Sequence, residues 1–288
     1  METRVSVSVA KRPLWRRLGG TVKRAGYRAW TPIDRLFRPD PLLPPAHLRV
    51  YYYRSTRPGA FHAACATVKT ELVSRGLQPH HRVLDIGSGI GNLAVALLDD
   101  LRGGYDGVEI HPEAVTWCQH AISARHPAFR FHRADLVNSA YNPAGASHAD
   151  RYRFAFPDRS FDYVYLGSVF THMPVEEVEH YVREIARLLA PGGRCIASFF
   201  LLDGDSRGGI DAGASFMPFG QDDATGRFRL HDAAVPGAAI AIDEVWVRAL
   251  FAREGLVISD VRRGRWWSGV AHDQDIVTAR SAARPGVH

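Results

Sequence analysis

Glycines at alternating positions constrain this chain more than any other feature. An apolar segment at 82–86 is followed by Gly87, Gly89 and Gly91, and a helix-like segment begins at 92–98. Glycine takes backbone conformations that side chains disfavour, and it lets a ligand lie directly against the main chain. A strand, a glycine-rich turn and a helix in succession therefore predict a ligand-binding turn at the edge of an α/β sheet.

The spacing of these glycines differs from the dinucleotide fingerprint, which reads G-x-G-x-x-G. Asp85 stands two residues before the first glycine, so the pattern here is D-x-G-x-G-x-G. A pyrophosphate favours helix amides without a carboxylate beside them, whereas a carboxylate suits a cationic ligand. The pattern resembles the first motif of the class I S-adenosylmethionine-dependent methyltransferases, whose cofactor carries a sulfonium and an ammonium group.

Further segments follow in the order that this family shows. Glu109 lies one strand-helix-strand unit after Asp85, where an acid can accept hydrogen bonds from ribose hydroxyls. A Pro-Gly-Gly helix stop at 191–193 is also typical of the family. The predicted segments are strands at 105–110, 129–132 and 161–166, a helix at 175–189 and a strand at 194–202.

The alternation of strands and helices predicts an α/β fold with a doubly wound, mostly parallel seven-stranded sheet and an N-terminal helical extension. The resemblance implies a Rossmann-like methyltransferase fold whose last strand inserts antiparallel. Strands at 256–261 and 274–279 and a helix at 242–254 complete the sheet. The predicted divisions are a basic arm and Pro-rich linker (1–45), a helical cover of the cofactor site (46–79) and a methyltransferase domain (80–282), with 204–241 an irregular lid or substrate loop.

The resemblance covers 80–203, extends over 242–280 and implies S-adenosyl-L-methionine as the cofactor. It implies that Asp135 meets the adenine amino group, and it suggests His111 for the adenine or ribose, a role that stays open. The cofactor-binding positions that we predict are Asp85, Gly87, Ser88, Gly89, Gly91, Glu109, Ile110, His111, Asp135, Leu136 and Leu166.

Catalysis of methyl transfer depends on positioning the nucleophile in line with the methyl group. An oxygen or nitrogen nucleophile with a high pKa also needs a base. His172 is the candidate, because it follows the fourth strand and its ordinary pKa lies near neutrality. The alternative is that His172 caps or orients the helix that begins near Pro174, and a similar Phe-Thr-His run in many relatives favours that role.

Two other features carry alternatives. Asp203 ends the fifth strand and either faces the substrate or caps the turn before Gly204, and capping is favoured. Trp266 and Trp267, flanked by arginines, either stack on a sugar ring or pack against the sheet edge, and packing is slightly favoured.

Apolar runs and cysteine spacing indicate in which compartment the protein is expected. No run approaches the ~20 apolar residues that a membrane span needs. Cys65, Cys118 and Cys195 form no C-x-x-C pair, so we predict neither a metal site nor a disulfide framework. A reducing, cytoplasmic location is expected, and nothing in the sequence sets the oligomeric state.

The positive charge is confined to the N-terminal arm. Residues 1–40 hold ten Lys/Arg and three Asp/Glu, a net charge of +7, whereas the whole chain carries +6. The rest of the chain is thus close to neutral, which argues against nucleic acid as a partner. The arm, residues 1–38, either contacts an anionic membrane peripherally or is a solvated extension, and the second is favoured.

Methyl transfer to a small-molecule or glycan acceptor, at oxygen, is the leading hypothesis. Neither an Asn-Pro-Pro-Tyr motif nor a catalytic cysteine pair is present to favour nitrogen or base chemistry. A NAD-type Rossmann oxidoreductase is one alternative, but it would require G-x-G-x-x-G and a Tyr-Lys pair. A non-catalytic cofactor-binding or scaffold protein is another, because no catalytic dyad is defined.

Overall fold

The structure is a computed structural model of the 288-residue chain, and it describes residues 31, 34, 40–270 and 273–282. Apart from residues 31 and 34, the predicted basic arm (1–38) lies outside the described residues, and so does its proposed contact with membranes. Two compact units divide the chain between Phe61 and His62. No helix in the described part of the chain is both long enough and apolar enough to cross a membrane.

The first unit contains helix α2 (Ala46–Tyr53), and helix α3 (Pro58–Ser74) begins in it and crosses the unit boundary. Arg49 is fully buried on α2 and pairs with the buried carboxylate of Asp34. The chain turns between the helices because Arg54 takes a left-handed φ of 53°, and Pro58 suits the first position of a new helix. The role of 46–79 as a cover for the cofactor site stays a prediction.

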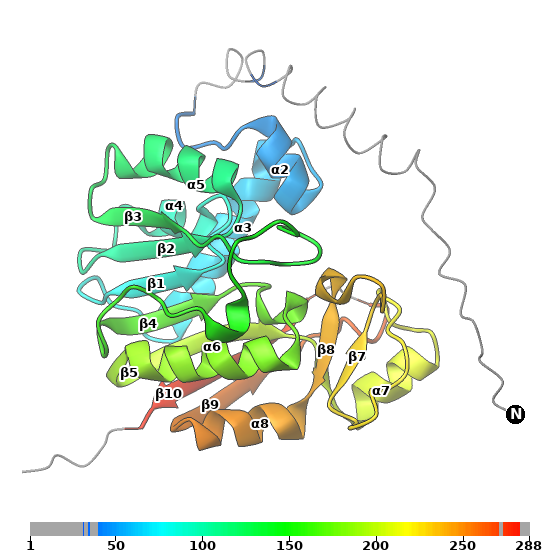
Figure 1. Cartoon of the computed structure of the whole chain (residues 1–288). Coiled ribbons are helices and arrows are strands. Elements are labelled where there is room, and N and C mark those ends of the chain that lie inside the picture. Colours follow the sequence, from blue (N-terminus) through cyan, green and yellow to red (C-terminus); the bar gives the residue numbers. More distant parts are fainter. Residues whose placement is uncertain (1–30, 32–33, 35–39, 271–272, 283–288) are drawn as a thin grey trace, which may run out of the picture. The chain divides into compact units, whose positions relative to one another are not determined.

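The second unit is built on a seven-stranded sheet. Its strands are β1 (Val83–Ile86), β2 (Tyr105–Glu109), β3 (Phe129–Arg133), β4 (Phe161–Leu166), β5 (Leu189–Phe199), β9 (Leu256–Arg262) and β10 (Asp275–Ser281). Their order is β3-β2-β1-β4-β5-β10-β9 (Figure 1). β1 to β5 pair in parallel, while β10 runs antiparallel to β5 and β9. The prediction of a mostly parallel sheet with an antiparallel last strand is confirmed.

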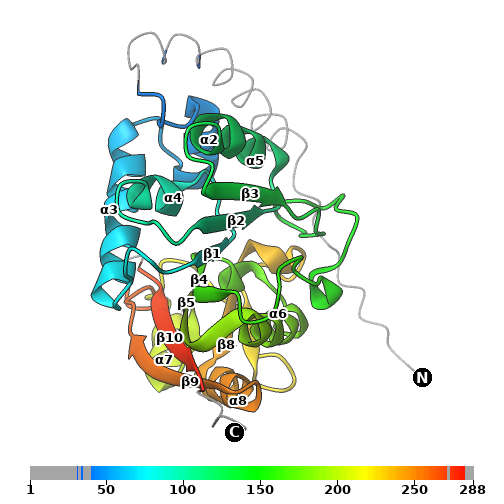
Figure 2. The same cartoon turned by 90° about the vertical axis from the view of Figure 1, so that its left-hand side faces the viewer.

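Helices cover both faces of this sheet. They are α4 (Asn92–Leu97), α5 (Pro112–Cys118) with a π-helical continuation (Gln119–Ser123), α6 (Val175–Leu188) and α8 (Glu244–Arg253). α6 and α8 lie on one face, and α4 lies on the other with the part of α3 that belongs to this unit (Figures 1 and 2). α6 packs through an apolar stripe at helical spacing that includes Val175, Val178, Val182 and Ile185. The strand order reverses between β1 and β4, which is where ligands bind in open α/β sheets.

A second, three-stranded sheet follows β5 in the chain. It is ordered β6-β8-β7 and consists of β6 (Leu201–Leu202), β8 (Ile240–Asp243) and β7 (Phe228–Leu230), with helix α7 (Gly204–Asp211) beside it (Figure 1). We call residues 200–243 the accessory subdomain. Its apolar core consists of Phe200, Leu202, Ile210, Phe219, Ala239 and Ala241, with Trp266 from the loop before β10. The expectation that 204–241 is irregular is therefore wrong.

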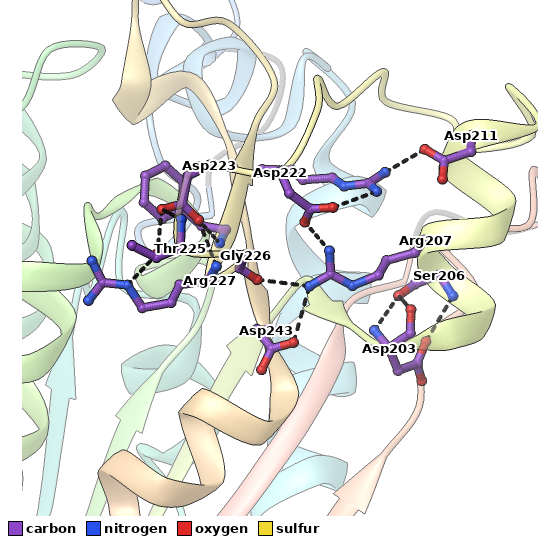
Figure 3. Close-up of polar contacts among 12 residues, drawn as sticks. Asp203, Ser206, Arg207, Asp211, Asp222, Asp223, Thr225, Gly226, Arg227 and Asp243 are labelled. Atoms are coloured by element: carbon purple, nitrogen blue, oxygen red, sulfur yellow. Dashed lines mark hydrogen bonds and ion pairs between the residues drawn. The ribbon is translucent and has the colours of Figure 1, made fainter.

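Polar contacts explain how this glycine-rich segment folds. Asp203 and Ser206 form a capping box at the start of α7, which confirms the favoured capping role of Asp203. Arg207 pairs with Asp222 and with Asp243, and it thereby ties α7 to the turn before β7 and to the start of α8 (Figure 3). Arg229, 4% exposed, pairs with Asp211 and Asp222 at 2.6 and 2.9 Å.

Two predicted boundaries around β5 are wrong. α6 ends at Leu188, because Leu189 is already extended and Ala190 precedes a proline, which disfavours helix. The predicted strand 194–202 is broken at Phe200, and its last two residues pair with β8 in the second sheet.

Candidate functional site

The turn between β1 and α4 is closed by contacts that glycine permits. Gly87, Gly89 and Gly91 have left-handed φ values of 76°, 53° and 77°. A Cβ atom at Gly87 would lie 2.4 Å from Cγ2 of Val169, and one at Gly91 would lie 2.8 Å from Cδ1 of Ile122. The turn therefore packs directly under the loop that follows β4, at the carboxyl ends of the central strands.

Asp85 lies near the end of β1 and is 2% exposed. Its Oδ2 accepts a hydrogen bond of 2.5 Å from the Tyr105 hydroxyl of β2. Burial raises the pKa of Asp85 to about 7, an effect that the Tyr105 hydrogen bond opposes. The sequence analysis missed Tyr105, although the pairing of parallel strands places it on the same sheet face as Asp85.

Glu109 ends β2 and joins that strand to the glycine turn. One carboxylate oxygen accepts a hydrogen bond from the Gly89 N–H and the other from the His111 N–H, both at 2.8 Å. His111 is the N-cap of α5, where its Nδ1 accepts a hydrogen bond from the Ala114 N–H. Glu109 therefore ends β2, as predicted, and also lies beside the turn. Its hydrogen bonds with ribose, and the contacts of His111 with adenine or ribose, stay predictions.

The remaining predicted cofactor positions lie after β2, β3 and β4. Asp135 Oδ1 accepts hydrogen bonds from Arg133 at 2.9 Å and from Asn142 at 3.1 Å. The Leu136 and Leu166 side chains are buried in the main apolar core, and Ile110 packs against it. Asp135 therefore offers an exposed polar group, and the apolar residues mainly support the strand ends.

His172 lies in the 3₁₀ turn Phe170–His172 after β4. Its Nδ1 lies 3.0 Å from the Gly237 carbonyl oxygen, and its Nε2 lies 3.2 Å from the Tyr141 hydroxyl. A carbonyl oxygen only accepts, so Nδ1 carries the proton and Nε2 is left as an acceptor. Burial lowers the pKa of His172, so its neutral form is favoured. Tyr141 and Gly237 were not assigned as partners of His172 from the sequence.

Three segments meet at His172. Asn138, in the loop after β3, donates a hydrogen bond of 3.1 Å to the His172 carbonyl. In the accessory subdomain, the Gly237 N–H donates to the Ser139 hydroxyl at 3.0 Å. The loop after β3, the turn after β4 and the accessory subdomain are thus held together around one imidazole.

His132 of β3 and the Trp266–Trp267 pair do not contact this imidazole. His132 Nε2 lies 2.9 Å from the buried carboxylate of Asp106. Trp266 is fully buried in the accessory core, and its indole N–H donates to Asp275 at 2.8 Å. Trp266 and Trp267 are therefore a packed pair, as favoured, and they do not form an exposed stacking platform.

The family comparison addresses the central part of the chain. Residues 84–197 match the family described as "Methyltransferase domain". This part of the chain is thus similar to a methyltransferase domain. The predictions of that domain and of S-adenosylmethionine as its cofactor are confirmed for these residues, and the match gives no support to the oxidoreductase alternative.

One curated relative is 27-O-demethylrifamycin SV methyltransferase of Amycolatopsis mediterranei (strain S699), which is 32% identical over 138 residues. The match covers 48% of this chain and 45% of the relative, so the chain matches about half the length of that protein.

Solved structures share the methyltransferase domain's fold. The PH0226 protein from Pyrococcus horikoshii OT3 has a TM-score of 0.54 and 16% identity, covering 81% of this chain and 95% of that one. The [4+2]-cyclase SpnF has a TM-score of 0.51 and 18% identity, covering 80% and 83%. The predicted Rossmann-like fold is confirmed, and a cyclase among the neighbours illustrates that this fold hosts more than one chemistry.

The residues at the turn fit the methyltransferase domain's cofactor. Asp85 offers a carboxylate to a cationic group, and Glu109 places its carboxylate beside the turn, where it accepts hydrogen bonds. Among the described residues, the buried hydroxyls of Ser88 and Thr171 have no hydrogen-bond partner. Buried polar groups are normally hydrogen-bonded, so a polar ligand reaching these hydroxyls would complete the site.

Proposed function

We propose that this protein is an S-adenosylmethionine-dependent methyltransferase that methylates a hydroxyl group of a small-molecule or glycan acceptor. One observation carries the proposal: within a methyltransferase domain, two buried carboxylates, Asp85 and Glu109, flank a glycine turn at the sheet's switch point. The name of the curated relative describes an acceptor demethylated at oxygen, which supports a small molecule and an oxygen nucleophile.

The side chains have separate roles in this proposal. S-adenosylmethionine supplies an activated methyl group when it is bound. Asp85 binds the positively charged part of the cofactor, and Glu109 accepts hydrogen bonds from the ribose hydroxyls. His172 is the base and receives the acceptor's proton at Nε2, since Gly237 fixes the proton of Nδ1.

The acceptor is proposed to bind beside His172, between the loop after β3 and the accessory subdomain. Tyr141 is 41% exposed and its ring packs edge-on against His172 at 5.0 Å. A ligand that approaches Nε2 therefore meets the Tyr141 hydroxyl. The segment 204–241 retains its proposed part in acceptor binding, but as a folded subdomain.

The location is proposed to be cytoplasmic, with the arm (1–38) as a peripheral contact to an anionic membrane. Cys65, Cys118 and Cys195 are all buried free thiols, as expected in a reducing compartment.

Isothermal titration calorimetry with S-adenosylmethionine and, separately, NADH tests the cofactor. Micromolar binding of S-adenosylmethionine alone is expected, and binding of NADH alone would contradict the proposal. Labelled-methyl transfer is then measured on a panel of hydroxylated acceptors that includes 27-O-demethylrifamycin SV, with His172→Gln as the variant that lacks the base. Cofactor binding with no transfer to any acceptor would favour a scaffold or a different reaction.

A further inference from the structure

The Asp85 carboxylate has one hydrogen-bond partner among the described residues. That partner is the Tyr105 hydroxyl, which donates to Oδ2, so Oδ1 receives no hydrogen bond from the described part of the chain. Both residues are buried, with Asp85 2% and Tyr105 0% exposed. The arrangement holds one carboxylate oxygen and leaves the other for a ligand.

The sequence of β2 and β3 explains why Tyr105 reaches Asp85. Val83 pairs with Tyr105 and Asp85 pairs with Gly107, so these four residues share one face of the sheet. A Cβ atom at Gly107 would lie 2.8 Å from Cδ1 of Phe131 and 2.9 Å from Oγ of Ser88, so this glycine lets the Phe131 ring pack closely beside Tyr105.

Aromatic neighbours on β3 hold that ring in place. Phe129 stacks on Tyr105 at a centroid distance of 5.3 Å and an interplanar angle of 22°, and the Phe131 ring lies 5.6 Å away. The hydroxyl is thus aimed at Asp85 by packing, in a buried position that it cannot leave without breaking these contacts.

Among the residues that the structure describes, no cationic group interacts with Asp85. The titratable groups that interact with it are Tyr105 and Glu109 of β2, Tyr165 of β4 and Cys118 of α5. Glu109 raises the pKa of Asp85, as burial does, and only the Tyr105 hydrogen bond lowers it. A buried carboxylate is costly unless it is paired, so the positive charge that pairs with Asp85 is expected to arrive with a ligand.

We propose that Tyr105 is a positioning residue for the cofactor: its hydroxyl orients the Asp85 carboxylate and keeps it ionised, so that Oδ1 receives the ammonium group of S-adenosylmethionine. This inference rests on the assignment of S-adenosylmethionine as the cofactor. Tyr105 acts through Asp85 and does not touch the reacting atoms.

The test compares the wild type with Tyr105→Phe, which removes only the hydroxyl. The probe is S-adenosylhomocysteine, which keeps the ammonium group, and its Kd is measured by calorimetry at pH 6, 7 and 8. Tyr163→Phe is the matched control, because it removes a hydroxyl that donates to the Arg75 carbonyl at 2.9 Å, away from Asp85. Methylthioadenosine, which lacks the amino-acid part, is the control ligand and also reports whether each variant is folded.

The expected effect depends on pH. Losing a hydrogen bond to an ionised group corresponds to a rise of about one unit in the pKa of Asp85, from about 7 to about 8. The ionised fraction then falls about ninefold at pH 6, about fivefold at pH 7 and less than about twofold at pH 8. The Kd ratio of variant to wild type should follow these values, because titration of the ligand itself cancels in the ratio.

The outcomes separate this inference from the proposed function. If wild-type protein binds no S-adenosylhomocysteine, the cofactor assignment is wrong. If the wild type binds but Tyr105→Phe leaves Kd unchanged, changes it equally at all pH values, or weakens methylthioadenosine as much, the role of Tyr105 is wrong. In an Asp85→Asn background, Tyr105→Phe is expected to change Kd no further, and an undiminished effect there would also overturn it.

Discussion

Replacing Asp275 by alanine should destabilise the protein strongly, because this carboxylate fastens the accessory subdomain to the main sheet. Asp275 is 1% exposed at the start of β10. Its oxygens accept hydrogen bonds from the Leu201 N–H at 2.8 Å, the Gly264 N–H at 2.9 Å and the Trp266 indole N–H at 2.8 Å. Alanine leaves these three N–H donors without their acceptor, and each unsatisfied donor costs about 1 kcal/mol or more. We therefore expect the free energy of unfolding to fall by about 3 kcal/mol.

Asp275→Asn separates the hydrogen bonds from the charge. Burial raises the pKa of Asp275, so its surroundings do not favour the ion, and a neutral amide that keeps one acceptor oxygen should cost less than alanine. Because the folded protein binds this proton more tightly, the contribution of Asp275 to stability falls as pH rises from its ordinary value, near 3.8, through the raised pKa. The advantage of the wild type over Asp275→Ala should therefore shrink with rising pH across that range.

Urea unfolding followed by tryptophan fluorescence measures these differences, since Trp266 is itself a partner of Asp275. Asp273→Ala is the matched control: its carboxylate is 40% exposed and accepts a hydrogen bond of 3.2 Å from the Arg265 N–H. The control should lose less than about 1 kcal/mol. A loss of less than about 1 kcal/mol in Asp275→Ala would refute the reasoning.

Three further predictions follow from the turn, the imidazole and the arm. Gly87→Ala should raise the Kd for S-adenosylmethionine about tenfold or more, because its Cβ atom would clash with Val169. Gly192 has a similar φ of 77° but open space around it, so Gly192→Ala should leave this Kd unchanged. Equal effects of the two substitutions in calorimetry would contradict the clash. Burial lowers the pKa of His172 below 6.5, so the unfolded chain takes up its proton first and stability is lost as pH falls below 6.5. In His172→Gln the Tm should thus fall less between pH 7 and 5, and an identical fall would show that His172 does not contribute. Deleting residues 1–38 should abolish salt-sensitive binding to anionic vesicles at low ionic strength. If the shortened protein co-sediments with the vesicles as much as the full chain does, the arm is not the membrane contact.

The central strands could be predicted from the sequence because each is a short segment with buried apolar or aromatic residues between turn residues. β4 was predicted at its observed bounds, and β1, β2 and β3 to within one residue. Asp85 was predicted at the glycine turn and Glu109 at the end of the next strand, because their spacing along the chain reflects the repeat of the fold. These features are local, and local patterns are what a sequence displays directly.

The accessory subdomain could not be predicted because its strands are only two to four residues long. Such strands show no alternation, and their stability comes from partners distant in the chain. Gly209 illustrates the difficulty: it weakens α7 as a helix, yet a Cβ there would lie 2.5 Å from the Trp267 carbonyl oxygen. In the sequence, Gly209 therefore favoured the prediction of a loop. In the structure, the same glycine lets α7 pack closely against Trp267. The partners of His172 and Asp85 were missed for the same reason.

The accessory subdomain leaves the main sheet after β5 and rejoins it through α8, so it is one continuous insertion, whose apolar core is completed by Trp266 from the loop before β10. An insertion of this kind can be exchanged as a single cassette while β1 to β4 keep their sequence. Engineers can therefore recombine this cassette with those of other proteins of the same fold to diversify the methyl acceptors. The main sheet must then keep Trp266 and the Asp275 carboxylate, and each cassette must supply a backbone carbonyl to His172, as Gly237 does here.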